Sequence, residues 1–182
     1  MVLDVNGPRR VPRATKSDRA PHDLAGRAAT VDARNAVKVE RSIDVRAPRE
    51  KLYAFWHDVR NQPRFMKYLE SVEPIDERHS RWTMTLPGGR HVEWESEIVN
   101  DQPNELIAWK TVEDSDVAHA GSVHFEPGPN GGTTVRWVMD YEPPSGRSAR
   151  LLSKLVGLSP EQLIDEDLRR FKQLMESDAT TR

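Results

Sequence analysis

Cysteine is absent from the 182 residues of this chain. Its absence excludes disulfides, thiolate nucleophiles and cysteine-based zinc sites, and it is typical of a reducing compartment, so we expect a cytoplasmic protein. No apolar run is long enough to span a bilayer, and the N-terminus lacks the apolar middle of a secretory signal. The net charge of −2 gives no reason to expect nucleic acid as a partner.

The first 35 residues differ from the rest in charge. They contain seven Lys/Arg and four Asp/Glu, a local charge of +3, which leaves −5 for the remainder. Such a segment buries too little apolar surface to offset its ordering entropy. We therefore expect a disordered basic tail over 1–35, one domain over 36–177 and a short tail over 178–182. A solvated extension is the simpler interpretation of the basic tail. The alternative is an interaction module that docks on a membrane surface or an acidic partner.

Alternating apolar residues predict strands from residue 37 onward. Residues 37–45 alternate, with Arg41 interrupting the apolar side. A helix is expected over 47–59, and Pro63 indicates a second short helix over 60–69 that bends away from it. Five further strands are expected over 81–86, 91–99, 105–111, 118–126 and 133–141.

Helical spacing returns after the last strand. A short helix is expected over 147–157, and a long one over 159–177. The long helix begins with Ser159 as N-cap and Gln162 three residues later, a capping-box arrangement. A sheet with one apolar face has to be covered, and this helix is the long element available to cover it. The fold class is therefore α+β, with an antiparallel sheet packed on the C-terminal helix.

This order of elements resembles the SRPBCC superfamily of START domains and birch-pollen-allergen-like proteins. The matching stretches include "VERSIDVRAPREKLYAFWHDVRNQPRFMKYLESV", "HVEWESEIVNDQPNELIAWKT" and "AGSVHFEPGPNGGTTVRWVMDYEPP". They are similar to a bacterial subgroup called polyketide cyclase/dehydrase, or compared with coenzyme Q-binding START-like proteins. The resemblance implies a helix-grip fold, in which a seven-stranded sheet wraps around the last helix and encloses a cavity.

On that fold, the residues in phase on the apolar face line the cavity. The expected ligand contacts are Phe65, Met66, Trp82, Met84, Trp94, Ser96, Trp109, His119, Val123, Phe125, Trp137, Met139, Tyr141, Leu152, Leu155, Ile164 and Leu168. Aromatic rings and flexible methionines favour a flat or chain-like apolar ligand.

Three residues on this face are catalytic candidates. His119 is able to orient a ligand oxygen or act as acid or base, although a strand-end histidine bonded to backbone is the simpler interpretation. Tyr141 offers a hydroxyl to the cavity or plugs the end of the sheet. Arg41 either extends outward or supplies a buried cation for an enolate or head group.

Other polar residues are interpreted as surface features. His57 and Asp58 are adjacent on a helix and do not face each other. Glu93, Glu95 and Glu97 alternate opposite Trp94 and point to solvent. His79 and His91 flank a hairpin without a third ligand, so we expect no metal site and no cofactor.

Three functions are therefore compatible with the sequence. The first is binding, for transport or sensing, of a hydrophobic small molecule such as a lipid, quinone or polyketide-like compound. The second is an aromatase/cyclase or dehydratase that acts on a polyketide-like chain. The third is the interaction or stress-response module that docks through the basic tail.

Overall fold

The computed structural model describes residues 37–112, 118–141 and 159–177. Seven strands form one antiparallel sheet in the order β1-β7-β6-β5-β4-β3-β2. Their bounds are β1 Val37–Val45, β2 Leu69–Pro74, β3 His79–Leu86, β4 Arg90–Gln102, β5 Leu106–Thr111, β6 His119–Pro127 and β7 Thr133–Tyr141. The tails predicted over 1–35 and 178–182, and the helix predicted over 147–157 with Leu152 and Leu155, lie outside the described residues.

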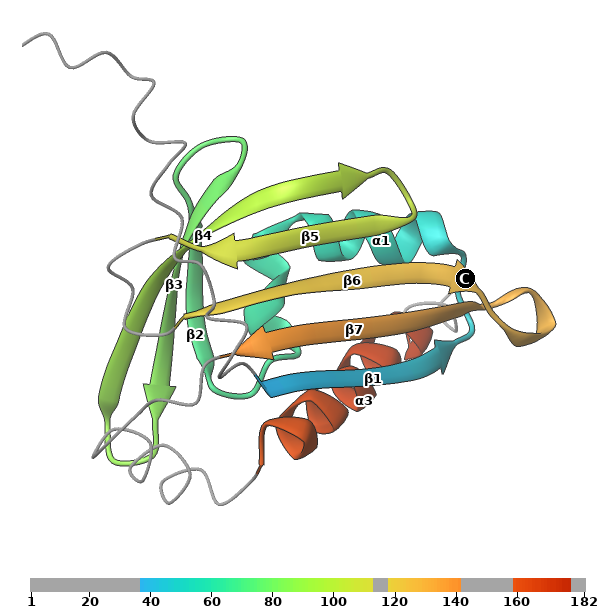
Figure 1. Ribbon diagram of the computed structural model, residues 1–182. Helices are drawn as coiled ribbons and strands as arrows, with labels where there is room; N and C mark the ends of the chain where they lie inside the picture. The colour runs from blue at the N-terminus through green and yellow to red at the C-terminus, as the bar shows by residue number, and fades with distance from the viewer. Residues whose placement is uncertain (1–36, 113–117, 142–158, 178–182) are drawn as a thin grey trace, which may run out of the picture.

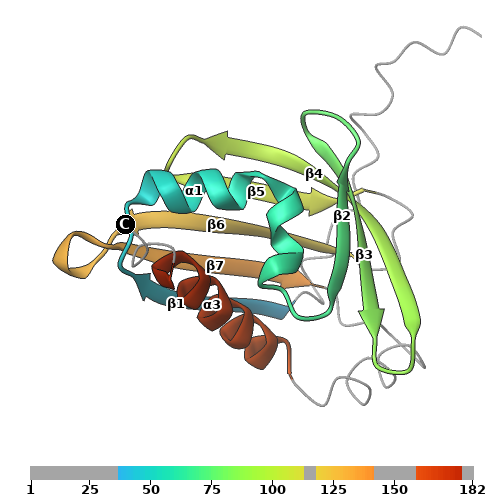
Figure 2. The same ribbon diagram turned by 180° about the vertical axis from the view of Figure 1, so that it is seen from behind.

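Apart from the 3₁₀ turn η3 (Pro129–Gly131) in the β6–β7 connection, the described helical elements lie on one face of the sheet (Figures 1 and 2). They are α1 (Arg49–His57), the 3₁₀ helix η2 (Val59–Arg64) and α3 (Pro160–Ser177). None of the helices in this part of the chain is long and apolar enough to cross a membrane. The resulting architecture is the helix-grip-like α+β fold predicted from the sequence.

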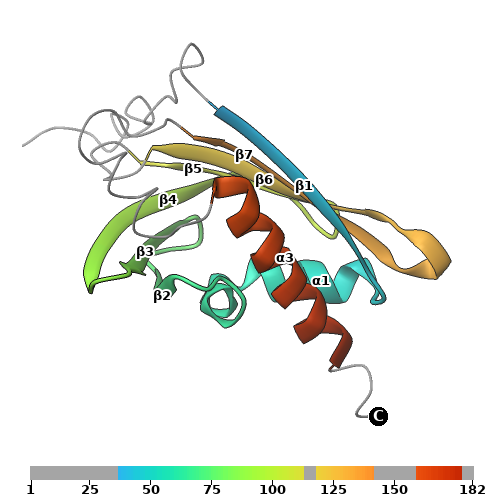
Figure 3. The ribbon, with the colours of Figure 1, turned by 90° about the horizontal axis from the view of Figure 1, so that it is seen from below.

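The sheet bends strongly along its length, as Figure 3 shows. At the bend lies β4, which is 13 residues long and pairs with β5 only from Ser96 onward. Its first half extends beyond β5 and pairs with β3, which in turn pairs with β2. We call β1, β5, β6 and β7 the main sheet, and β2, β3 and the first half of β4 the arm. The arm curls toward the side on which the helices lie.

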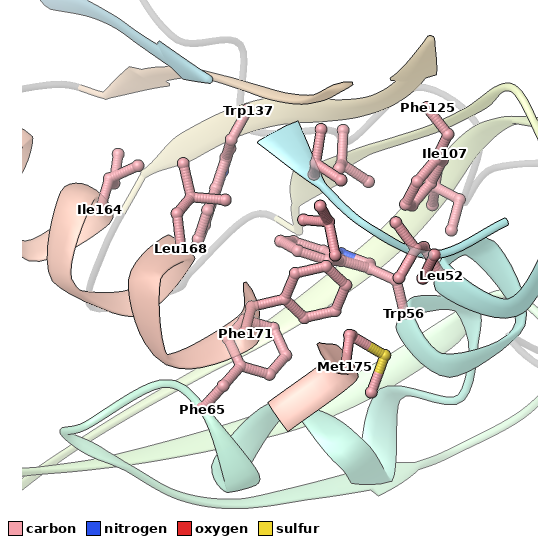
Figure 4. Packing of buried hydrophobic residues seen from close by; sticks show 14 of the residues in the cluster. Leu52, Trp56, Phe65, Ile107, Phe125, Trp137, Ile164, Leu168, Phe171 and Met175 are labelled. Carbon is pink, nitrogen blue, oxygen red and sulfur yellow. The ribbon is translucent and has the colours of Figure 1, made fainter. Parts of the chain in front are cut away.

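The main sheet carries the larger hydrophobic cluster (Figure 4). At its centre Trp56 packs with ring centroids 5.0 Å from Phe65, 5.0 Å from Phe171 and 5.3 Å from Trp137. These contacts join α1, the residue that follows η2, α3 and β7. A smaller cluster covers the arm and contains Leu69, Val72, Leu86, Val92 and Trp94. Met66 packs against both clusters.

The start of α3 confirms the predicted capping box. The Ser159 backbone N–H donates to Gln162 Oε1 at 2.8 Å, and the Gln162 N–H donates to Ser159 Oγ at 3.3 Å. Further along, Arg170 Nε donates to the Phe65 carbonyl at 2.8 Å, and the Lys67 N–H donates to Asp167 at 3.2 Å. These two bonds fasten α3 to the segment between η2 and β2.

Two sequence predictions require correction. The second helix does not run over 60–69: it ends at Arg64, and Leu69 begins the strand β2. Strand β2 has a register shift between Leu69 and Ser71, so its buried residues do not alternate. The other correction concerns β4, which continues to Gln102 rather than 99 because a second register shift between Ile98 and Asn100 keeps it paired with β5.

Candidate functional site

A row of polar side chains crosses the otherwise apolar inner face where the main sheet meets the arm. We call Tyr141, His119, Thr111, Ser96 and Ser80 the polar row. His119 is opposite Tyr141 in the β6–β7 pair, Ser96 opposite Thr111, and Ser80 opposite Ser96. The Thr111 hydroxyl oxygen joins the two halves by accepting from the His119 backbone N–H at 3.1 Å. An ordinary core would place apolar residues at these positions.

His119 has a buried ring atom without a partner. The residue is 9 % exposed, and no described residue forms a hydrogen bond with its Nδ1. Burial lowers the pKa of His119 to about 4, so the imidazole is neutral at neutral pH. A buried polar atom that forms no hydrogen bond is costly, so a native site that contains one requires a reason.

The indole of Trp94 has a similar unsatisfied group. Its Nε1 is buried, and no hydrogen-bond acceptor for it exists among the described residues. The ring lies edge-on to that of His119, with centroids 5.7 Å apart, and stacks on Trp82 with centroids 5.9 Å apart. Trp82 differs in one respect, because its Nε1 donates to Ser80 Oγ at 2.9 Å. The contacting rings of Trp94 and His119 therefore contain one buried N–H donor and one buried imidazole nitrogen that no described residue satisfies.

Half-buried large side chains pack against the two hydrophobic clusters that lie on either side of this pair. They are Met66, Trp82, Met84, Trp109, Met139 and Tyr141. Trp109 lies over Gly121, where a Cβ would come within 2.8 Å of the indole, so the absence of a side chain at 121 gives the ring its position. Large apolar side chains that are only half buried have surface available for a ligand.

Other residues predicted to contact ligand pack against one another instead. Phe65, Val123, Phe125, Trp137, Ile164 and Leu168 are at most 4 % exposed and belong to the main cluster. Their contacts in the structure are with α1, α3 and the main sheet, and a ligand contact at these positions stays a prediction. Trp137 resembles Trp94 in one way, because its buried Nε1 also finds no partner in the described part of the chain.

The other two catalytic candidates lie in different surroundings. Tyr141 is half buried beside His119, and its pKa is raised, first by burial and then by the charge of Glu161. Arg41 lies on β1, four residues from Val37, which is the partner of Tyr141. This separation is about 13 Å along the strand. The Arg41 guanidinium pairs with Asp165 at 3.3 Å and donates to the Glu40 carbonyl at 2.7 Å, so the side chain extends outward to α3.

His57 and Asp58 do not form a dyad. His57 is exposed and pairs through Nε2 with Asp101 at 3.1 Å, and Asp101 also accepts from the Tyr53 hydroxyl at 2.6 Å. Asp58 accepts instead from Arg60 at 2.8 Å. Sequence reasoning missed Asp101 because it lies 44 residues from His57 and no local spacing connects them.

A surface pocket of about 270 Å³ lies between the end of α1 and the β2–β3 hairpin. Ser80 borders it and also belongs to the polar row. Its arginines and histidines are engaged in ion pairs with neighbouring acids, for example Arg78 with Glu97 and His79 with Asp76. Because these charges are already compensated, the pocket is a weaker candidate than the region around His119.

The carboxylates and the remaining histidine behave as surface groups. Glu93 is exposed, and Glu95 and Glu97 form ion pairs on the outer face. His91 pairs with Glu70 and is opposite Thr85, whereas His79 is opposite Glu97 at the other end of the β3–β4 hairpin, so the two histidines do not meet. The described residues contain no cluster of three His, Cys, Asp or Glu side chains able to hold a metal ion.

The sheet and the long C-terminal helix define a helix-grip-like fold. Comparisons with known proteins agree with this fold class. The family model "Polyketide cyclase / dehydrase and lipid transport" matches residues 45–172, and the chain belongs to this family. An uncharacterized 17.2 kDa protein of Streptomyces lincolnensis is 32% identical over 139 residues, which cover 76% of this chain and 89% of that protein.

Solved structures show the same fold. A protein of Deinococcus radiodurans has a TM-score of 0.63 and 34% identity, with 78% of this chain and 98% of that chain covered. The Zhui aromatase/cyclase of a Streptomyces species has a TM-score of 0.66 over 80% of this chain and 97% of its own. Its identity of 17% makes it evidence for the fold alone.

Proposed function

We propose that this protein binds an apolar small molecule, reversibly and without converting it, against the inner face beside His119. The observation that carries the proposal is the pair of unsatisfied buried atoms, His119 Nδ1 and Trp94 Nε1, within a wall of half-buried aromatic and methionine side chains. A small number of polar groups in an apolar lining is typical of ligand sites. The family description, which includes lipid transport, is consistent with this role.

The state of His119 favours binding over acid–base chemistry. An efficient general base has a pKa near the operating pH. With a pKa of about 4, the imidazole is a weak base at neutral pH and carries no proton to donate as an imidazolium. A neutral imidazole remains a good hydrogen-bonding group, which is the property that a binding site needs.

Binding is tested with a fluorescent apolar probe, N-phenyl-1-naphthylamine, and with native mass spectrometry of the purified protein. We expect saturable probe binding and a co-purifying small molecule that is released on denaturation. Met139→Ala, on the inner face, should weaken probe binding by about tenfold, because it removes more than one methylene of contact. Val138→Ala, its neighbour on the outer face of β7, is the matched control and should leave affinity unchanged. Absence of saturable binding, or equal effects of the two variants, would contradict the proposal.

One observation supports a second candidate, a cyclase. His119 and Tyr141 are opposite each other in register, so a substrate between them would meet two groups able to relay enol protons. Turnover of a poly-β-keto surrogate that falls with both His119→Ala and Tyr141→Phe would support this function. Turnover that neither substitution changes would exclude these two residues from it.

A further inference from the structure

The indole N–H of Trp94 is a group with one chemical capability. It donates a hydrogen bond and accepts none, so only an acceptor atom satisfies it. Within the described ranges it has no acceptor, although it is buried and next to an imidazole nitrogen in the same condition. Trp82, stacked on Trp94, has an acceptor within the protein, because its N–H donates to Ser80 Oγ. The Trp82 N–H is therefore already bonded, whereas the Trp94 N–H is left for an acceptor atom of a ligand.

We propose that the ligand of this site is an oxygenated apolar molecule whose carbonyl oxygen accepts the Trp94 Nε1–H, with a second oxygen a few atoms away for His119. This inference rests on the proposed binding function. The chemical class is a flat ketone with a neighbouring carbonyl, enol or hydroxyl oxygen. Hydrocarbons of the same shape are disfavoured because they leave both nitrogen atoms buried without partners.

The small hydroxyl groups nearby already form hydrogen bonds within the protein. Ser96 Oγ donates to the Lys110 carbonyl at 3.2 Å, and Thr111 Oγ1 already accepts from His119 N–H. Ser80 Oγ accepts from Trp82. Trp94 Nε1 and His119 Nδ1 differ from them because they are buried and have no partner among the described residues, so a ligand oxygen at this site satisfies these two atoms first.

The test uses two probes of the same shape, tetralin and 1-tetralone, which differ by one carbonyl oxygen. We expect the wild-type protein to bind 1-tetralone at least about fivefold more tightly, the contribution of one hydrogen bond to a buried donor. In a ¹H–¹⁵N spectrum, 1-tetralone should move the Trp94 indole resonance downfield, and tetralin should not. The spectrum of Trp94→Phe identifies that resonance by its loss.

Two tryptophan variants separate the hydrogen bond from the loss of an indole. Trp94→Phe should reduce the preference for 1-tetralone to less than about twofold while tetralin affinity changes little. Trp82→Phe is the matched control: it weakens both probes equally and retains the preference, because the Trp82 N–H is bonded to Ser80.

The possible outcomes distinguish this inference from the proposed function. If neither probe binds and N-phenyl-1-naphthylamine also fails to bind, the binding function itself is wrong. If both probes bind with equal affinity, or if Trp94→Phe leaves the preference intact, the binding function stands and the assignment of Trp94 as the reader of a carbonyl oxygen is overturned.

Discussion

At the scale of single residues, His119 connects the site to the stability of the protein. Its pKa is about 4 in the folded protein, against an ordinary value near 6.5 in an unfolded chain. Protonation therefore favours unfolding. The stability that the neutral ring contributes is fully present above pH 6.5 and is lost as the pH falls toward 4.

We expect the free energy of unfolding to fall by on the order of 2–3 kcal/mol from this residue between pH 7 and 4.5. Urea unfolding of the wild type and of His119→Leu at both pH values measures it. Carboxylates such as Asp167, whose pKa is raised by burial, titrate in both proteins, so the difference between the two isolates the imidazole. Equal losses in the two proteins would show that His119 titrates normally.

The sequence predicted some residues of the polar row and missed others. Alternation placed Ser96, His119 and Tyr141 on the apolar face, and the structure brings all three into the polar row. Thr111 and Ser80 were missed because a small hydroxyl residue at a strand end gives no signal by itself. Their role depends on the register between strands, which no single strand encodes.

At the scale of elements, the cap of α3 holds the helix that covers the main sheet. Ser159→Ala should destabilise the protein by about 1 kcal/mol, as removal of an N-cap side chain does. Gln162→Ala should cost less, and the double variant should cost less than the sum because the two bonds belong to one reciprocal motif. Chemical denaturation of the three variants measures these differences.

Ser177→Ala, at the other end of α3, is the control for that series. The Ser177 hydroxyl donates to the Leu174 carbonyl at 3.0 Å on an exposed surface. We expect a change within about 0.5 kcal/mol there. Strictly additive losses for Ser159 and Gln162 would contradict a coupled capping box.

Elements with regular periods were predicted well, and those with irregularities were not. Strand β7 and helix α3 keep their periods throughout, β1 departs from its alternation only at Arg41, and the positions of all three are confirmed. Strand β2 contains a register shift and buries Leu69 and Val72, three residues apart. This spacing is typical of a helix, so the pattern concealed a strand. The same effect shortened the prediction for β4.

At the scale of the whole molecule, the two hydrophobic clusters differ in size. The main sheet is covered by α1 and α3, whereas the arm relies on the smaller cluster around Trp94. Regions with fewer buried apolar contacts open more readily. We therefore expect backbone amides in the β3–β4 hairpin to exchange hydrogen faster than those paired between β6 and β7.

Hydrogen-exchange mass spectrometry measures that difference. The same measurement with 1-tetralone bound provides a second test. A ligand held between Trp94 and His119 contacts the arm and the main sheet together, so it should slow exchange in the arm more than in the main sheet. Equal protection of both regions in the free protein would show that the arm is as stable as the main sheet.

The position of β1 has a consequence for the synthesis of the protein. Val37 pairs with Tyr141, so the edge strand made first is completed by the strand made last, about a hundred residues later. At typical translation rates of about 5–20 residues per second, β1 waits on the order of ten seconds for its partner. Strands β2 to β6, which pair in chain order, are able to assemble as successive hairpins in the meantime. In the nascent chain, β1 thus stays unpaired while the remainder of the sheet forms near the ribosome.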